Sequence, residues 1–197
     1  MLALTFDDGP GTRLTTSILE VLAEHDVKAT FFLLGRNIPN REYIVRKIAE
    51  QGHQIASHGY DHLHHWKVSP IRTIKDIKRG WQAVDSALGT KKQKYPYRPP
   101  YGKLNTVCLL YLLAHRVPIV YWTLDSGDTW PQTKQDSRRI PSLATKAGGA
   151  VVLAHDFDRS DDSADSMVLE FTRSAIAIAE IENMHILTIS ELLNHKK

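Results

Sequence analysis

Short apolar segments alternate with longer segments of helical periodicity along the whole chain, and this alternation limits the fold more than any other feature. The apolar segments lie at residues 2–6, 29–34, 53–57, 95–98, 118–124, 150–154 and 185–189. They are short and mostly apolar, which is typical of strands that are buried on both faces of a parallel sheet. Strands that alternate with helices in this way predict an α/β fold with helical crossovers.

Helical periodicity fills the intervals between these strands. It is found at residues 14–22, 41–51, 69–89, 105–115, 167–181 and 191–195, and a polar helix that breaks or restarts near Pro141 is also expected. Ser69 and Pro70 are typical of a helix N-cap followed by proline at the first helical position, and Gly89 is typical of a helix end. Residues 156–165 are rich in aspartate, and a solvated loop is expected there.

A single domain spanning residues 1–197 is expected, because the chain has no evident linker, repeat or low-complexity segment. With 197 residues, 42% of them hydrophobic, it can bury a substantial core. An open doubly wound sheet and a closed barrel both fit the alternation. An eight-unit barrel usually needs about 250 residues, so the length favours a barrel with one unit fewer.

Residues suited to chemistry stand where the expected strands end. Asp7 and Asp8 follow the first strand, and two adjacent carboxylates are costly unless a cation or a proton is shared between them. His58 and His62 follow the third strand, at a spacing that lets both imidazoles face one metal. A carboxylate from the aspartate pair would complete a three-ligand set with open positions, as catalytic zinc requires.

Other polar residues stand at further strand ends, namely Arg98, Asp125, Asp128 and His155. In a barrel, the C-terminal strand ends surround one mouth, whereas in an open sheet they are spread along an edge. Because one site would need residues from several of these ends, the pattern favours the closed form.

Four segments of the chain carry a family resemblance. They are Thr5-Phe6-Asp7-Asp8-Gly9-Pro10, His58-x-x-x-His62, Arg98-Pro99-Pro100-Tyr101-Gly102 and Leu153-Ala154-His155-Asp156. In this order they resemble the polysaccharide deacetylase family, which is the NodB-homology group or carbohydrate esterase family 4. The resemblance covers most of the chain and implies a distorted seven-stranded (β/α) barrel, similar to a TIM barrel.

The resemblance also implies a metal-dependent hydrolase with assigned residues. Asp8, His58 and His62 would bind a divalent metal, with zinc expected and cobalt or nickel as alternatives that suit the same ligands. A water on that metal would be the nucleophile, and Asp7 would be the general base that accepts its proton. Arg98 would hold Asp7 ionised and oriented.

The remaining roles that the resemblance implies belong to groups around the substrate. The main-chain N–H of Tyr101 would stabilise the oxyanion. His155 would be the general acid that protonates the departing amine, and Asp128, or alternatively Asp125, would hold its imidazole charged. Leu153 would line a small pocket for the acetyl methyl group, or serve only as barrel core.

The chain departs from the family pattern at three places. Gly59 stands where the family has serine or threonine, so the loop loses a hydroxyl brace, and weaker metal binding is expected. Thr129 separates Asp128 from Trp130, although Trp130 can still wall the pocket from a shifted position. The run His64-His65-Trp66 replaces the usual proline after His62; the two histidines are expected to be exposed or to lie behind the metal ligands, and Trp66 either stacks on a sugar or is buried.

Composition bears on partners and compartment. The formal charge of +3 is small, and without a recognition motif we expect no nucleic-acid partner. Cys108 is the single cysteine, so no intrachain disulfide can form, and a buried, inert thiol is expected.

No apolar run is long enough to span a bilayer. A monomer is expected. The family suggests a secreted or cell-surface protein, but no signal peptide is evident, which fits a cytoplasmic protein or an excised catalytic domain.

These features together favour N-deacetylation of N-acetylglucosamine units in a polysaccharide of the peptidoglycan or chitin type. One rival is an esterase that removes O-acetyl groups from xylan, and another is a deacylase of a small-molecule or lipid-linked sugar amide. A non-catalytic carbohydrate-binding module is the third alternative. Residues 156–165 have an alternative of their own, a lid whose carboxylates meet the cationic glucosamine product.

Overall fold

The computed structural model describes residues 1–129, 140, 149–160 and 162–195. Its strands are β1 (Leu2–Asp7), β2 (Thr30–Leu33), β3 (Gln54–Ser57), β4 (Leu124–Asp125) and β5 (Ala150–His155). Its helices are α1 (Leu14–Glu24), α2 (Glu42–Glu50), α3 (Pro70–Leu88), α4 (Thr106–Ala114), α6 (Asp162–Ile181) and α7 (Ile189–Asn194), with short 3₁₀ helices at Gly35–Asn37 and Pro100–Gly102. None of the described helices is long and apolar enough to cross a membrane.

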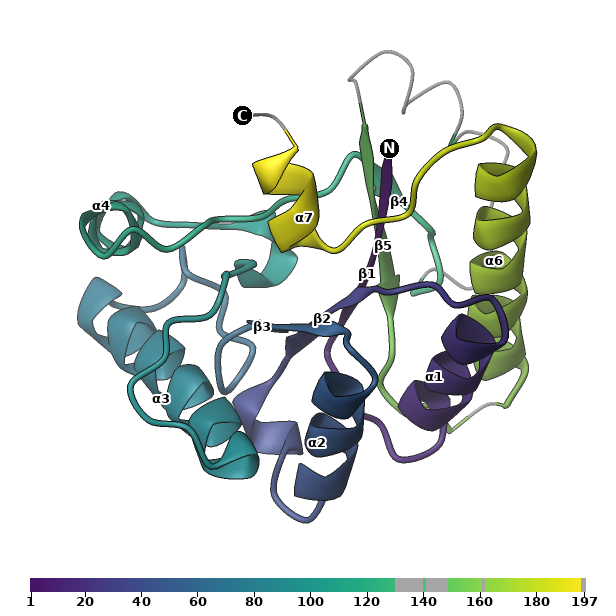
Figure 1. The fold of residues 1–197 in the computed structure, drawn as a ribbon. Coiled ribbons are helices and arrows are strands. Elements are labelled where there is room, and N and C mark those ends of the chain that lie inside the picture. The colour runs from purple at the N-terminus through teal and green to yellow at the C-terminus, as the bar shows by residue number, and fades with distance from the viewer. Residues whose placement is uncertain (130–139, 141–148, 161, 196–197) are drawn as a thin grey trace.

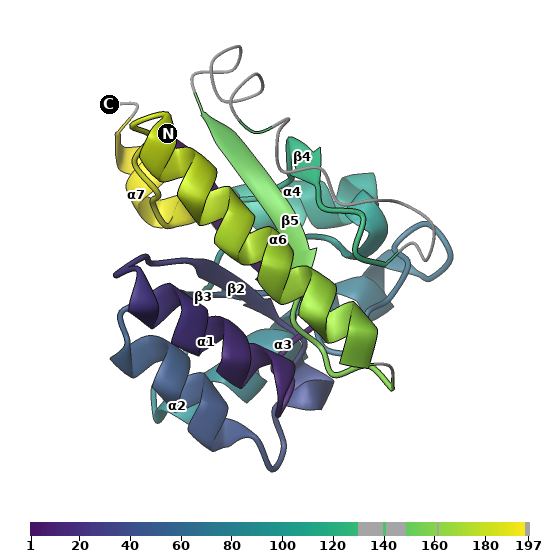
Figure 2. The same ribbon diagram turned by 90° about the vertical axis from the view of Figure 1, so that its right-hand side faces the viewer.

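The strands form one parallel sheet in the order β3-β2-β1-β5-β4. Helices α1, α2 and α6 cover its outer face, and α1 and α6 lie side by side (Figures 1 and 2). This arrangement confirms the predicted α/β fold with a parallel sheet. In the register of the sheet, Asp7 at the end of β1 pairs with Phe32 on one side and with His155 on the other.

Both faces of the sheet are buried, which explains why its strands are mostly apolar. On β1, Leu2, Leu4 and Phe6 belong to the large cluster that packs against the helices. The alternate residue Ala3 belongs to a second cluster on the inner face. That cluster also contains Phe32, Ala56, Val120, Ile189 and Leu192. Because side chains alternate along a strand, Asp7 shares the inner face with Ala3, and α7 closes this inner core near the N-terminus (Figure 1).

The described residues form five strands, and the predicted count of seven is therefore not confirmed. The segments 95–98 and 118–124 contribute isolated parallel bridges at Tyr97 and Ile119, and the second ends in Leu124, the first of the two residues of β4. Pro96, Pro99 and Pro118 flank these bridges and cannot donate to a ladder. The segment 185–189 is likewise reduced to a bridge between Leu2 and Ile186, because Thr188 already caps α7.

Most predicted helices are confirmed, with ends shifted by a few residues. Ser69 caps α3 by accepting the N–H of Arg72 at 3.4 Å, and Gly89 ends the helix with φ 69°. The acidic segment 156–165 is not wholly a loop, because α6 begins at Asp162. The polar helix expected near Pro141 lies outside the described residues.

Candidate active site

The strand ends of the sheet converge on one cavity of about 510 Å³. Asp7 ends β1, His155 ends β5, and His58 directly follows β3. The cavity is lined by Asp7, Asp8, His58, His62, Tyr101, Trp122, Asp125, Thr129, His155 and Phe157. The structure therefore brings together the aspartate pair, both histidines of the His-x-x-x-His segment and His155, as the sequence predicted.

Asp8, His58 and His62 form a group that could hold a metal ion. Their ligand atoms all lie within 4.8 Å of one another. Asp8 Oδ1 is 3.6 Å from His58 Nε2 and 3.4 Å from His62 Nε2. Asp8 and His62 both have left-handed backbones, with φ 72° and 58°, which is uncommon for residues other than glycine and clusters at functional sites.

The donor set fits a divalent cation. The Oδ1 atom of Asp8 is buried and has no hydrogen-bond partner among the described residues, and such an orphaned anionic oxygen is costly unless a cation satisfies it. His58 Nδ1 lies 2.8 Å from the carbonyl oxygen of Arg98. Because a carbonyl oxygen only accepts, the proton resides on Nδ1 and Nε2 is left as a ligand. Burial lowers the pKa of His58 to about 3 and also lowers that of His62, so both imidazoles are neutral ligands.

A buried arginine holds one carboxylate oxygen of Asp7, while the other, Oδ2, lies 3.7 Å from His58 Nε2. Arg98 Nη1 donates to Asp7 Oδ1 at 2.7 Å and to the hydroxyl of Thr5 at 2.8 Å. The Arg98 side chain is 0% exposed, and its guanidinium lies 4.0 Å from the ring centre of Phe32. Burial raises the pKa of Asp7, and the Arg98 guanidinium opposes that rise. Asp7 thus has an ion-pair partner and a basicity above that of an ordinary aspartate.

His155 has a buried carboxylate partner on the other side of the cavity. Its Nδ1 lies 2.9 Å from Asp128 Oδ1, and its main-chain N–H donates to Asp128 Oδ2 at 3.1 Å. Burial alone would lower the pKa of His155, but the hydrogen bond and charge of Asp128 raise it to about 9. Arg159 and Ser126 donate to the same carboxylate at 2.6 and 2.7 Å, and sequence reasoning did not identify these two residues.

The other predicted site residues have varied positions. Tyr101 lines the cavity with φ 58°, and its exposed ring lies 4.5 Å from that of His62. Leu153 is buried in β5, at a position that alternates with its outward-packing neighbours, and it is not among the lining residues given above. Asp125 is exposed and accepts the N–H of Gly127, so Asp128 is the carboxylate that holds His155. Trp130 lies outside the described residues.

The loop that carries the two histidines has a brace that the sequence did not reveal. Gly59 has φ 84°, and a Cβ atom there would lie 2.5 Å from the carboxylate of Asp76. That carboxylate, on α3, accepts the N–H groups of Tyr60 and Asp61, both at 2.9 Å. Glycine is thus needed at position 59 for the close approach of Asp76, which takes over the bracing expected of a hydroxyl.

His64 and His65 differ from each other in their surroundings. His65 is buried, and its Nε2 lies 2.9 Å from the hydroxyl of Tyr97, so it is not an exposed residue of the loop. His64 is partly exposed, and its ring lies 5.2 Å from the ring of Tyr101. Trp66 is 64% exposed, which excludes the alternative that it is buried under the loop.

Two carboxylates of the acidic segment after His155 hold it to the rest of the structure. The Asp158 carboxylate accepts the N–H groups of Thr12, Arg13 and Leu14 at 2.6, 2.9 and 3.0 Å, and so caps the N-terminus of α1. Asp156 is fully buried and accepts from the Thr15 hydroxyl at 2.7 Å. The predicted solvated loop is therefore wrong for Asp156, whereas Asp158 is exposed as predicted. Because both carboxylates already bind the chain, they are poorly placed to act as a lid. Asp161 lies outside the described residues.

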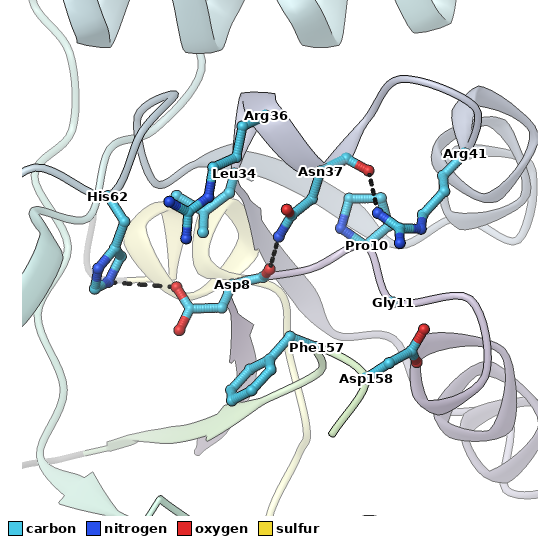
Figure 3. A pocket seen from close by; sticks show the side chains of 10 residues that line it. All are labelled: Asp8, Pro10, Gly11, Leu34, Arg36, Asn37, Arg41, His62, Phe157 and Asp158. Atoms are coloured by element: carbon cyan, nitrogen blue, oxygen red, sulfur yellow. Dashed lines mark hydrogen bonds and ion pairs between the residues drawn. The ribbon is translucent and has the colours of Figure 1, made fainter. Parts of the chain in front are cut away.

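A second cavity of about 380 Å³ adjoins the first and shares Asp8, His62 and Phe157 with it (Figure 3). Asn37 borders it and donates to the main-chain oxygen of Asp8 at 2.7 Å. Its lining also includes Pro10, Gly11, Leu34, Arg36, Arg41 and Asp158. Asp8 and His62 therefore lie between two cavities, one lined by Asp7 and His155 and the other by Arg36 and Arg41.

Comparisons with known proteins identify the family to which the chain belongs. The family model described as polysaccharide deacetylase matches residues 1–134, and the chain belongs to that family. It is 32% identical over 199 residues to the peptidoglycan-N-acetylglucosamine deacetylase PgdA of Listeria monocytogenes, a match that covers 99% of this chain but 39% of that protein. It is 36% identical over 153 residues to a chitooligosaccharide deacetylase of Rhizobium leguminosarum bv. trifolii, covering 78% of this chain and 70% of the relative.

The fold comparison gives the same family. The crystal structure of the Bc1960 peptidoglycan N-acetylglucosamine deacetylase superposes with a TM-score of 0.83 at 28% identity, covering 96% of this chain and 86% of that one. The chain spans well under half the length of the Listeria relative.

Replacing Asp128 by asparagine tests what holds His155 charged. We expect the pKa of His155 to fall from about 9 toward its ordinary value of 6.5, because the variant removes the carboxylate charge. Titration of the histidine ring signals by NMR measures this directly, without any assay of activity. Asp125→Asn is the matched control and should leave the titration in place. An unchanged pKa in the Asp128 variant would contradict the assignment.

Replacing Asp76 by alanine tests the brace of the histidine loop. Two main-chain N–H groups lose their acceptor, so we expect divalent-metal affinity to fall by about 10–100-fold, as for other supports of metal ligands. Isothermal titration calorimetry with zinc measures the loss. Asp85→Ala removes another buried carboxylate from α3 and serves as the control. Equal zinc affinity in the two variants would show that Asp76 does not support the site.

Proposed function

We propose that this chain is a metal-dependent hydrolase that removes the acetyl group from N-acetylglucosamine units of a polysaccharide of the peptidoglycan or chitin type. One observation carries the proposal. The Arg98-held carboxylate of Asp7 and the Asp128-held imidazole of His155 flank one cavity, beside the group formed by Asp8, His58 and His62. The family membership and the names of the two relatives support the same reaction.

Asp8, His58 and His62 would hold the metal, and zinc is the ion we propose. Cobalt and nickel suit the same two imidazoles and carboxylate and are the alternatives. When bound, such a cation polarises a carbonyl oxygen and makes a neighbouring water more acidic. The open cavity beside these ligands leaves room for the substrate.

The protein's own residues manage the two protons of amide hydrolysis. Asp7 accepts a proton from the water as the water oxygen forms its bond to the carbonyl carbon, and Arg98 keeps Asp7 oriented for that transfer. His155 then gives its Nε2 proton to the sugar nitrogen as the carbon–nitrogen bond breaks, which releases acetate and a free amine. The main-chain N–H of Tyr101 is proposed as the donor to the oxyanion.

The charged form of His155 suits the proton transfer that an amide substrate requires. The nitrogen of an amide leaves only after it is protonated, because an unprotonated amide anion is a much poorer leaving group than an alkoxide. A pKa of about 9 keeps His155 protonated at neutral pH, which is what an N-deacetylase needs. The O-acetyl esterase on xylan and the deacylase of small or lipid-linked sugar amides use the same groups, so substrate tests must separate them. A binding module without activity does not need both charged pairs.

The finer features of fold and substrate contact belong to the same proposal. We infer a distorted seven-stranded barrel in one domain of residues 1–197, active as a monomer. The segment around Ile119 supports closure of the barrel: Val120 donates to the Tyr97 carbonyl and Thr123 to the Val151 carbonyl, both at 2.9 Å. Leu153 and Trp130 would line the acetyl pocket, and the neighbouring sugar would occupy the second cavity.

A substrate panel tests the proposed reaction. We expect acetate release from N-acetylchito-oligosaccharides or peptidoglycan fragments, its loss on treatment with a chelator, and its return with zinc. Acetylated xylan should release little acetate under the same conditions. A preference for acetylated xylan would move the chain to the esterase class, and zinc and sugar binding without any acetate release would support the binding module.

Two single variants separate the roles of the aspartate pair and the histidines. Asp7→Asn removes the base but no proposed ligand, so we expect turnover to fall by about 10²–10⁴-fold while zinc remains bound. His58→Ala should lose both zinc and activity. Zinc content by atomic absorption, measured beside acetate release, distinguishes the outcomes. Loss of zinc in the Asp7 variant would reverse the two aspartate roles, and an active His58 variant would refute the metal site.

A further inference from the structure

Helix α4 exposes an unusual amount of apolar surface. Only Cys108 and Leu112 of its nine residues are buried. Val107, Leu110 and Leu113 recur at the spacing of one helix face and are 50%, 61% and 57% exposed, and Leu109 is 37% exposed. No described residue covers this face. α4 lies at the edge of the molecule beside α3, on the opposite side from α6 (Figures 1 and 2).

Two further exposed residues extend this face toward the cavity. Trp66 is 64% exposed and donates its indole N–H to the carbonyl of Leu104, just before α4, at 3.2 Å. Ile71 is 69% exposed and follows Pro70, whose carbonyl lies 3.7 Å from Cys108 Sγ. We call the six residues Trp66, Ile71, Val107, Leu109, Leu110 and Leu113 the α4 surface.

The chain around the α4 surface is strongly basic. Residues 62–116 contain eleven of the 25 lysine and arginine residues but only two of the 22 acidic residues. Of the eleven, Arg98 is buried against Asp7, and Arg79 pairs with Asp61, just outside this range. The two acidic residues, Asp76 and Asp85, are both buried and accept hydrogen bonds. The remainder of the chain has an acidic excess. The exposed or partly exposed basic residues nearest in sequence to the α4 surface are Lys67, Arg72, Lys75, Lys78, Lys103 and Arg116.

We propose that the α4 surface docks on an anionic phospholipid bilayer. Apolar side chains including tryptophan and leucine, surrounded by lysine and arginine, are the features by which a peripheral helix binds the membrane interface. A second copy of the chain fits less well, since pairing two α4 surfaces would bring their basic surroundings together. An acidic polymer would be attracted by the basic residues but would gain nothing from four exposed aliphatic side chains on α4.

Docking in this way would place the mouth of the cavity close to the membrane. A row of rings connects the two: the ring of Tyr101, which lines the cavity, lies 5.2 Å from that of His64, and His64 lies 6.2 Å from Trp66. A glycan held near the bilayer, by a lipid anchor or by its position, would reach the cavity with little travel. The docking itself does not depend on the proposed deacetylase reaction.

Vesicle co-sedimentation tests the docking. The complete chain is mixed with vesicles of phosphatidylcholine alone, or of phosphatidylcholine with about one third phosphatidylglycerol, at low and high salt. We expect binding to the anionic vesicles that weakens as salt is raised, and about tenfold less binding to the neutral ones. No binding to the anionic vesicles, or equal binding to both kinds, would overturn the proposal.

Matched variants assign the binding to the α4 surface. Leu110→Ser with Leu113→Ser should lower the fraction bound to anionic vesicles by about tenfold, while acetate release from a soluble oligosaccharide and the melting temperature stay unchanged. Ile181→Ser is the control, because Ile181 is 76% exposed at the end of α6. Undiminished vesicle binding by the double variant would contradict the proposal, because the basic residues alone would then account for binding, as they would for an acidic polymer. Dimers that the double variant abolishes, without vesicle binding, would identify a second copy instead.

Discussion

The buried ion pair between Arg98 and Asp7 is the interaction on which the site depends. Two adjacent carboxylates stand at the end of β1, with Asp7 buried and Asp8 partly exposed, and a buried charge is tolerated only when it has a partner. Arg98 supplies one partner at 2.7 Å from inside the sheet. Removing either member of a buried pair leaves an uncompensated charge and typically costs about 3–5 kcal/mol. The pair therefore leaves Asp8 as the carboxylate available to a cation.

The same residue also shapes the ligand group. The carbonyl oxygen of Arg98 accepts a hydrogen bond from His58 Nδ1–H, so one arginine positions Asp7, the proposed base, through its guanidinium and His58, a proposed metal ligand, through its main chain. On the other side of the cavity, the Asp128 carboxylate accepts hydrogen bonds from His155, Arg159 and Ser126. The acid and the base therefore have separate charge partners, which sets Asp7 and His155 apart in basicity while they face one cavity.

Much of this site could be predicted from the sequence, because its principal residues stand at the ends of apolar strands. In a parallel sheet, the C-terminal ends of the strands lie along one edge, which explains why these residues come together. The strand order that pairs Asp7 with His155 was not predicted. The strand count was harder to predict, since Pro96, Pro99 and Pro118 replace regular ladders by single bridges. Asp76 and Asp158 were missed because their carboxylates accept main-chain N–H groups from distant parts of the chain. Gly59, which stands where the family has serine or threonine, was the one sequence feature near the histidines that indicated a different brace for their loop.

X-ray absorption at the zinc edge of the loaded protein tests the central claim most directly, namely that Asp8 shares a cation with His58 and His62 while Asp7 stays with Arg98. The account predicts a first shell of nitrogen and oxygen with the outer scattering of two imidazoles, unchanged when Asp7 is replaced by asparagine. A shell without imidazole scattering, or one that loses an oxygen in the Asp7 variant, would contradict it.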